Sequence, residues 1–382
     1  TTNVGGGHGT SVAGLAVARG WNNIGSRGVA PKSELAGCNI LESTAFSSDE
    51  LICLGNTSNY ALSNFDVWNM SYGSSGTGDS FNFDFYRYYG PSSWRNRVTN
   101  LRNGKGGIYV KSSGNGFGSD CGLVPGTISC DQSSFESDDA IPETIVVASL
   151  RADYVKSSYS SAGSGVWISG FGGEYGYDAG LGWQGSGTVS EDPAMMTTDR
   201  SSCTIGYVGD PSRQENNAFN QRTNPHPENL DCNYTSSFNG TSSAAPTVAG
   251  SVALILEANP SLTWRDVKHI LASTAIQTDA QRSVDIDGIN QYRWITNNAG
   301  FDWHQWYGFG VIDVNAAINM AENYNANSWS AFNEIGYEQG WSGNIQTAPD
   351  SGNVTISLNL SDGLAINTIE YMRIGVQFSH AY

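Results

Sequence analysis

Short apolar runs alternate along the chain with segments of helical periodicity. Strand-like runs are found at residues 33–41, 65–73, 106–115 and 143–150. Residues 9–19, GTSVAGLAVAR, have the small side chains of a helix that packs closely against a sheet. Alternation of this kind predicts an α/β fold, in which a parallel sheet carries helices on both faces.

Two strong helices are expected later in the chain. One covers about residues 242–257, and the next begins after Thr263, a good N-cap for the segment WRDVKHILAST. A closing helix is expected within residues 308–324. Between these parts, residues 170–237 are Gly-rich and acidic and contain a turn cluster, which indicates a surface insertion made of loops.

The composition shifts near residue 328. Beyond this point, residues 354–360 and 369–382 show the alternation typical of strands. We therefore expect one large domain over residues 1–327 and the beginning of a separate β unit over residues 328–382.

The excess of acidic side chains excludes some classes of binding partner. The 382 residues include 36 acidic and 19 basic side chains, which give a formal net charge of −17. Such a chain would be repelled by nucleic acid and by anionic membranes, so neither is expected as a partner. No apolar run is long enough to span a membrane. The acidic balance suits solubility in salty water, calcium binding or attraction of basic peptides, and composition does not rank these.

Cysteine usage indicates an oxidising compartment. The spacing of the cysteines matches no CxxC metal site, so disulfides are the better interpretation. Neighbours in sequence suggest the pairs Cys38–Cys53, Cys121–Cys130 and Cys203–Cys232, although other connectivities stay open. The first residues, TTNVGGGHGT, contain neither an initiator methionine nor a signal peptide. We therefore expect the chain to be a piece of an exported protein.

Three residues could carry chemistry. His8 would lie in the first turn of a helix, where, taken alone, a structural role is favoured over a functional one. Ser242 would begin another helix, either as an N-cap or as a nucleophile whose oxyanion is stabilised by the helix N-terminus. Asn115 follows a strand, either as a turn residue or as an amide donor aimed into a cleft.

Taken together, the motifs HGTSVAG, SSGNG and GTSSAAP resemble those of the subtilase family of serine peptidases. The resemblance covers essentially all of residues 1–327. It is strongest to the kexin and furin-like branch and its secreted bacterial relatives, through LILEANPSLTWRDVKHIL and YGFGVIDVNAAI. It implies a subtilisin-like parallel sheet flanked by helices, and the tail resembles the start of the β-sandwich P domain of that branch.

The resemblance implies a role for each candidate. Ser242 would be the nucleophile, His8 its general base, and Asn115 would form the oxyanion hole with the backbone N–H of Ser242. Subtilases also place an aspartate before the histidine, but residues 1–7 contain no acidic side chain. We expect the segment that bears this aspartate to be missing from the chain; a truly broken triad is the alternative.

Substrate contacts follow from the same resemblance. The peptide would pair with an edge strand, and its binding residues would be Ser71, Tyr72, Gly73, Ser113 and Gly114. Ser74, Ser75 and Gly76 stand where the kexin branch normally carries acidic residues, which argues against strict dibasic specificity. Asp138 aligns with a second acidic residue that lines the P1 pocket in that branch. We therefore still expect a preference for a basic residue at P1, the residue on the acyl side of the cleaved bond.

Two calcium sites are implied. The first would use oxygen ligands from the loop ARGWNNIGSRG, and its matching residues are Arg19, Asn22, Ile24 and Ser26; a plain turn is the alternative. The second would use Asp120, although Ser161 replaces the glutamate that usually completes it.

The resemblance thus implies a secreted, calcium-dependent, monomeric serine endopeptidase that acts on peptide or protein substrates. A propeptide or a dedicated chaperone would assist its maturation. One alternative is a degradative subtilase of broad specificity. The other is a catalytically inactive protein that uses the subtilase fold for binding.

Overall fold

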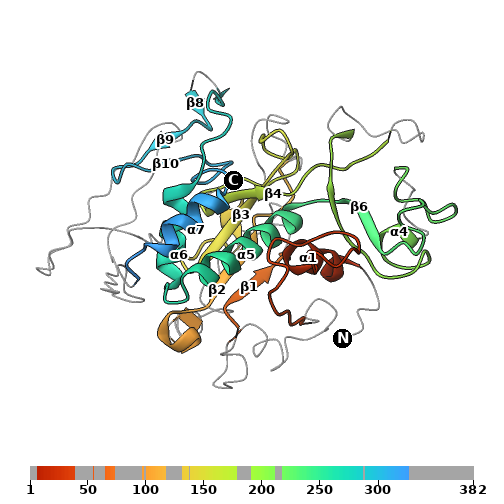
Figure 1. Cartoon of the computed structure of the whole chain (residues 1–382). Coiled ribbons are helices and arrows are strands. Elements are labelled where there is room, and N and C mark those ends of the chain that lie inside the picture. Colours follow the sequence, from red (N-terminus) through yellow and green to blue (C-terminus); the bar gives the residue numbers. More distant parts are fainter. Residues whose placement is uncertain are drawn as a thin grey trace, which may run out of the picture. The chain divides into compact units, whose positions relative to one another are not determined.

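The computed structural model describes most of the chain up to residue 326 (Figure 1). The described residues are 7–38, 55, 65–73, 97–98, 100–117, 131–136, 138–178, 191–210, 217–286 and 289–326. The chain forms two compact units, Thr1–Phe332 and Asn333–Tyr382. The β-sandwich expected over residues 328–382 lies outside the described residues.

A parallel sheet forms the centre of the first unit, as the alternating pattern predicted. Its strands follow one another in sequence order and are β1 (Val67–Met70), β2 (Ile108–Ser112), β3 (Thr144–Leu150) and β4 (Val166–Phe171). Every residue of β2 and β3 is buried. Strands covered on both faces need apolar side chains throughout, which explains the continuous apolar runs in the sequence.

Helix α5 (Thr241–Ala258) lies across the sheet and contacts all four strands (Figure 1). Small buried residues, among them Ala244, Ala245 and Val248, let this helix approach the sheet closely. Helices α1 (His8–Val17) and α7 (Val314–Glu322) pack against α5. The N-terminal ends of α1 and α5 contain the two motifs that carry His8 and Ser242.

Helix α6 (Trp264–Thr274) begins as the sequence predicted. The Thr263 side chain accepts a hydrogen bond from the backbone N–H of Asp266 at 3.1 Å, and the Asp266 carboxylate accepts one from the N–H of Thr263 at 2.9 Å. This capping box satisfies two N–H groups that a helix start leaves free.

The segment expected to be only loop contains regular structure. It holds the end of β4, an antiparallel pair made by β5 (Met195–Thr198) and β6 (Tyr234–Phe238), and the short helix α4 (Gly206–Gly209). Strand β5 is bonded to α1, because Thr197 Oγ1 donates to the Ser11 carbonyl at 2.7 Å and Ser11 Oγ donates to the Thr198 carbonyl at 2.9 Å. The insertion therefore supports the helix that begins with His8.

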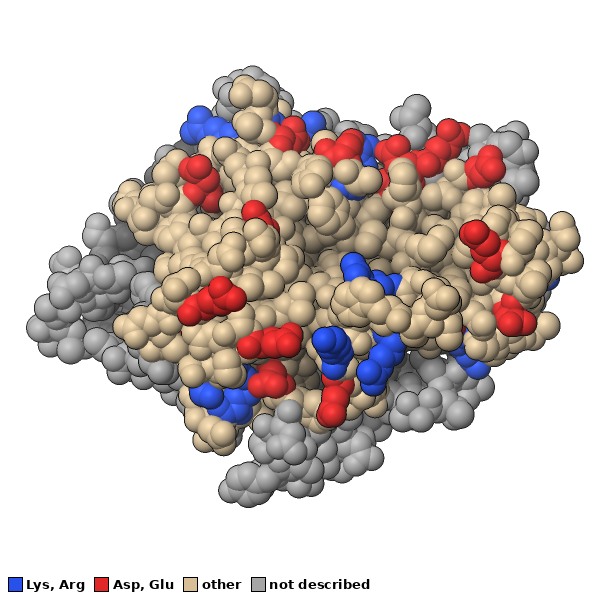
Figure 2. Space-filling model, viewed as in Figure 1, with Lys and Arg blue, Asp and Glu red and all other residues tan. Residues whose placement is uncertain are grey.

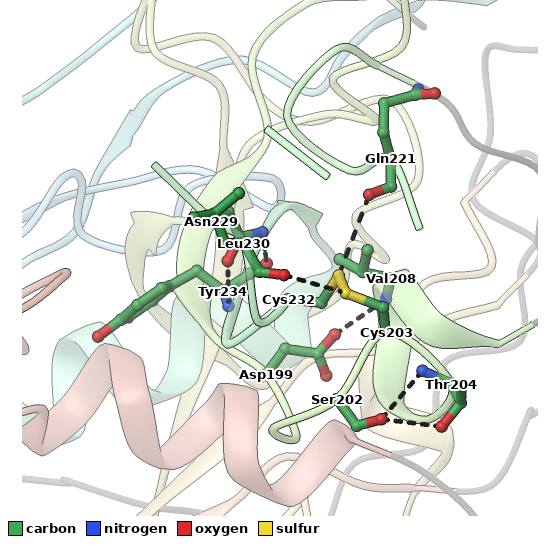
Figure 3. Close-up of a disulfide and its surroundings, with 10 residues drawn as sticks. All are labelled: Asp199, Ser202, Cys203, Thr204, Val208, Gln221, Asn229, Leu230, Cys232 and Tyr234. Atoms are coloured by element: carbon green, nitrogen blue, oxygen red, sulfur yellow. Dashed lines mark hydrogen bonds between the residues drawn. A yellow bond between two sulfur atoms is a disulfide. The ribbon is translucent and has the colours of Figure 1, made fainter. Parts of the chain in front are cut away.

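The expected disulfide Cys203–Cys232 is present and closes part of this insertion (Figure 3). Beside it, the buried Asp199 carboxylate accepts hydrogen bonds from the N–H groups of Tyr207 and Val208, both at 2.9 Å. Cys38 is also disulfide-bonded. Its partner and the cysteines at 53, 121 and 130 lie outside the described residues, so the other two pairings stay predictions.

Smaller elements complete the described part. Two antiparallel pairs are formed by β7 (Val284–Ile286) with β8 (Ile289–Gln291), and by β9 (Ile295–Thr296) with β10 (Asp302–Trp303). Short 3₁₀ turns lie at Leu101–Gly104 and Ser133–Phe135. The strand expected at 33–41 is not found over residues 33–38, which are irregular and mostly exposed. Without burial, an apolar run has little reason to join a sheet.

Acidic side chains are scattered over the face shown in Figure 2 rather than gathered in one patch. Such a distribution agrees with a general role of the negative charge in solubility. Among the described residues, no helix has the length and apolar character needed to cross a membrane.

Candidate active site

Ser242 is the second residue of α5, and it does not cap the helix. The N-cap is Gly240, and no side chain makes a capping hydrogen bond there. The Ser242 hydroxyl instead makes a long hydrogen bond, 3.4 Å, to the carbonyl of Ser71. The alternative role as an N-cap is therefore excluded, and the half-buried hydroxyl is available for chemistry.

The backbone N–H of Ser242 is a free donor. The N–H groups of the two adjacent residues already have acceptors. The N–H of Thr241 donates to Asn115 Oδ1 at 2.8 Å, and the N–H of Ser243 donates to the Gly240 carbonyl at 2.9 Å. Within the described part of the chain, the N–H of Ser242 has no such partner. A free N–H at a helix N-terminus favours negative charge beside it.

Asn115 supplies a second donor at the same place. Its Oδ1 atom accepts hydrogen bonds from the N–H of Thr241 and from Thr241 Oγ1, the latter at 3.0 Å. With the oxygen thus fixed, the Nδ2 group of the exposed side chain keeps its protons for another acceptor. Thr241 was not singled out from the sequence, although it lies in the motif GTSSAAP.

Gly240 leaves open the space between these two donors. A Cβ atom at this position would lie 3.4 Å from Asn115 Nδ2 and 3.5 Å from the backbone nitrogen of Ser242. Its φ of 99° also favours glycine. A hydrogen bond to the protein interior holds Gly240 in place: its N–H donates to the buried Tyr159 hydroxyl at 2.8 Å.

His8 is the first residue of α1, which packs against α5. Its ring lies edge-on to Phe238, with 5.6 Å between ring centroids, and Phe238 ends the strand four residues before Ser242. Burial lowers the pKa of the His8 imidazole below its usual value, so the ring stays neutral at neutral pH. Among the described residues, no carboxylate forms an ion pair with His8.

The predicted edge strand continues from β1 toward Ser242. Ser71 Oγ donates to the backbone carbonyl of Ser242 at 2.9 Å, and Asn69 Nδ2 donates to Ser71 Oγ at the same distance. Directly after the neighbouring strand β2, Ser113 Oγ donates to the Ser161 carbonyl at 3.1 Å, and Gly114 then precedes Asn115. The last backbone pair of β1 and β2 is Met70 with Lys111, so Ser71, Tyr72 and Gly73 lie beyond the pairing, as do Ser113 and Gly114.

A buried carboxylate that sequence reasoning missed lies beside the second strand. Asp131 Oδ2 accepts a hydrogen bond from Ser161 Oγ at 3.1 Å, and a Cβ built on Gly114 would lie 3.3 Å from this oxygen. Asp138, which was expected to line the P1 pocket, is placed in a buried cluster with Lys111. Burial raises the pKa of Asp138 to about 6.

The predicted calcium loop alternates between two backbone conformations. Trp21, Asn23 and Gly25 have positive φ, and the expected ligands Asn22, Ile24 and Ser26 stand between or beside them, with Arg19 at the start of the loop. Asn22 Oδ1 accepts the N–H of Ile24 at 3.2 Å, and the buried Ser26 hydroxyl has no hydrogen-bond partner in the described structure. The expected ligands are the backbone carbonyls of Arg19, Ile24 and Ser26 and the side chain of Asn22, all oxygen donors of the kind that calcium prefers; that calcium binds this loop stays a prediction.

A metal ion can also be held by a cluster of imidazole, thiolate or carboxylate ligands. The part of the chain that the structure describes contains no group of three or more His, Cys, Asp or Glu side chains that could hold an ion. Asp120, the expected carboxylate of the second calcium site, lies outside the described residues. Ser161, which stands in place of the glutamate of that site, donates a hydrogen bond from its hydroxyl to Asp131.

Known proteins match this chain over the same region. The model of the subtilase family matches residues 2–310. The extracellular serine protease of Aeromonas sobria is 33% identical over 347 residues, covering 83% of this chain and 50% of the relative. Kexin of Saccharomyces cerevisiae is 27% identical, covering 84% of this chain and 31% of its own length. The chain thus spans half or less of these relatives.

A solved structure supports the same assignment. The structure of the Aeromonas sobria serine protease in complex with a chaperone superposes with a TM-score of 0.67 at 31% identity. The match covers 84% of this chain and 53% of that protein. The resemblance seen in the three motifs is therefore confirmed: the chain belongs to the subtilase family and shares its parallel α/β fold.

Proposed function

We propose that the protein is a serine endopeptidase that cleaves peptide bonds through an acyl-enzyme on Ser242. The observation that carries this proposal is the pair of free donors, Ser242 N–H and Asn115 Nδ2, on either side of the space left open by Gly240. Two preorganised donors directed at one space suit the oxyanion of a tetrahedral intermediate.

His8 would act as the general base. The neutral imidazole takes the proton of Ser242 Oγ while this oxygen attacks the peptide carbonyl, whose oxygen becomes the oxyanion. The imidazolium then gives the proton to the departing amine as the C–N bond breaks. Water, deprotonated by His8 in turn, attacks the ester, and the proton returns to Ser242 as the acid product leaves.

The peptide would bind by adding a strand to the site. Ser71, Tyr72 and Gly73 would pair with it on one side, and Ser113 and Gly114 on the other. The P1 side chain would enter between the two chain segments, beside Asp131. A carboxylate at this position supports a preference for lysine or arginine at P1, and the charge of Asp138 would add to this preference.

Calcium, export and assisted folding complete the proposal. Arg19, Asn22, Ile24 and Ser26 would hold a calcium ion that fixes the loop following α1; this role is structural and no catalytic step involves it. The disulfides and the extracellular Aeromonas relative support secretion. The relative solved with a chaperone supports a dedicated chaperone as a folding partner.

The test is hydrolysis of fluorogenic peptides by the protein and by its S242A variant. We expect the wild type to cleave peptides ending in Lys-Arg at least about 10-fold faster, in kcat/KM, than matched peptides ending in Leu or Phe, and S242A to cleave neither. Equal rates would support the broad-specificity alternative. Peptide binding without turnover would support the inactive, binding alternative and would contradict the proposed function.

A further inference from the structure

Glu136 places a second carboxylate beside the proposed peptide-binding edge. Glu136 follows the 3₁₀ turn Ser133–Phe135, and its carboxylate occupies the space above Gly73 that a side chain would take. A Cβ built on Gly73 would lie 2.7 Å from Glu136 Oε2, so a larger residue at position 73 would displace the carboxylate. Glycine at the end of the edge strand thus makes room for Glu136.

A buried lysine holds Glu136 in this place. Lys111, at the end of the β1–β2 pairing, forms ion pairs with Glu136 and, at 3.2 Å, with Asp139. Burial alone would lower the pKa of Lys111, but the neighbouring carboxylates more than offset it, so the ammonium group stays charged. The ion pair with Lys111 holds the Glu136 side chain in one position, whereas a free glutamate side chain would sample several rotamers.

Glu136 is less deeply buried than the neighbouring carboxyl of Asp139 in this cluster. Burial raises the pKa of Asp139 to about 8, so this carboxyl is largely protonated at pH 7. Asp138 and Arg97 also face the cluster, and their charges oppose each other. Glu136 differs from these groups in its access to solvent, because its side chain is 16% exposed whereas that of Asp139 is 1% exposed.

Glu136 and Asp131 each lie against a glycine of a proposed peptide-binding segment. Asp131 lies against Gly114 and Glu136 lies against Gly73, and both glycines lie beyond the last backbone pair of β1 and β2. In the proposed binding mode, a P1 side chain that passes between these segments would approach both carboxylates. A cationic group there would be attracted to both, and these two negative charges would outweigh the single ammonium group of Lys111, which is paired with Glu136 and Asp139.

We propose that Glu136, held against Gly73 by Lys111, is a specificity-determining residue that selects a lysine or arginine side chain at P1. The inference rests on the proposed function, because it takes Ser71–Gly73 as the peptide-binding edge. It assigns to Glu136 the acidic position that Ser74, Ser75 and Gly76 do not fill.

The experiment compares wild type, E136Q and the matched control E322Q, which alters an exposed glutamate on α7. Each is assayed with two peptides that differ only in arginine or leucine at P1. We expect E136Q to lower kcat/KM for the arginine peptide by about 10-fold or more, with less than about a twofold change for the leucine peptide. E322Q should change neither. An unchanged arginine-to-leucine ratio, or an equal loss for both peptides, would overturn the proposal.

A binding assay separates this inference from the proposed function. Peptides that end in arginine or leucine are titrated into S242A and into S242A/E136Q by calorimetry. The inference predicts at least about tenfold weaker binding of the arginine peptide to the double variant and unchanged binding of the leucine peptide. If S242A binds arginine no better than S242A/E136Q, the inference fails even when wild-type hydrolysis has established the peptidase activity. If hydrolysis is absent but this difference is found, the proposed function alone fails.

Discussion

Thr241 binds the Asn115 side chain with two donors, its backbone N–H at 2.8 Å and its hydroxyl at 3.0 Å from Oδ1. Both hydrogen bonds fix the amide oxygen, so they also determine where the Nδ2 protons point. The residue before the proposed nucleophile thereby orients the side chain that would stabilise the oxyanion.

Replacing the Thr241 hydroxyl should weaken this orientation. We expect T241V to lower kcat by about 10-fold while KM changes little, because the donor acts mainly on the transition state. T241S keeps the hydroxyl and should stay close to wild type. Steady-state kinetics on one peptide series measures both, and a T241V variant altered only in KM would contradict this role of Thr241.

Adding a methyl group at Gly240 should close the oxyanion site. We expect G240A to reduce kcat/KM by about 100-fold or more, because the new Cβ enters the space between Asn115 Nδ2 and the Ser242 N–H. G300A is the matched control, since Gly300 also has a positive φ but has open space around its Cβ position. If both variants lost activity equally, backbone strain rather than filling of the site would explain the result.

The pH dependence of activity should reflect the burial of His8. Because burial lowers the pKa of the imidazole, the base stays neutral below the pH at which an exposed histidine becomes protonated. The acid limb of kcat/KM should therefore have its midpoint below about 6.5. F238A, which removes the ring packed on His8, should shift the midpoint upward. A wild-type midpoint at or above this value would contradict the assignment.

Removing the Cys203–Cys232 disulfide should destabilise the insertion that supports α1. The two cysteines are 29 residues apart, a separation for which the loss of the cross-link costs about 3.6 kcal/mol in the free energy of unfolding. Urea denaturation of C203A/C232A measures this difference. A change below about 0.5 kcal/mol would indicate that the insertion unfolds separately from the rest.

Local patterns were sufficient for much of the fold. The apolar runs predicted β1, β2 and β3, and the capping box of Thr263 predicted the start of α6. Strand β4 was missed because glycines flank it on both sides, and the β5–β6 pair was missed because its strands, MMTT and YTSSF, show no clear alternation of apolar and polar residues. Residues 33–38 look apolar enough for a strand but remain irregular, since tertiary burial rather than composition decides sheet membership.

The site was predictable only where its residues lie in recognisable motifs. His8, Asn115 and Ser242 were singled out in this way, and their roles stay proposals. Asp131 and Glu136 were not, because they lie in a segment without a distinctive motif and reach Gly114 and Gly73 only through the fold. Contacts between residues so far apart in sequence leave no local pattern to read.

The most direct test of the proposed chemistry is covalent labelling of the native protein with a fluorophosphonate, followed by peptide mapping. This reagent modifies serines that a base activates and that lie beside an oxyanion site. We expect a single adduct on Ser242, absent in S242A and formed at least about 100-fold more slowly in N115A. An unlabelled native protein, or an adduct on another serine, would contradict the assignment of Ser242 as the nucleophile.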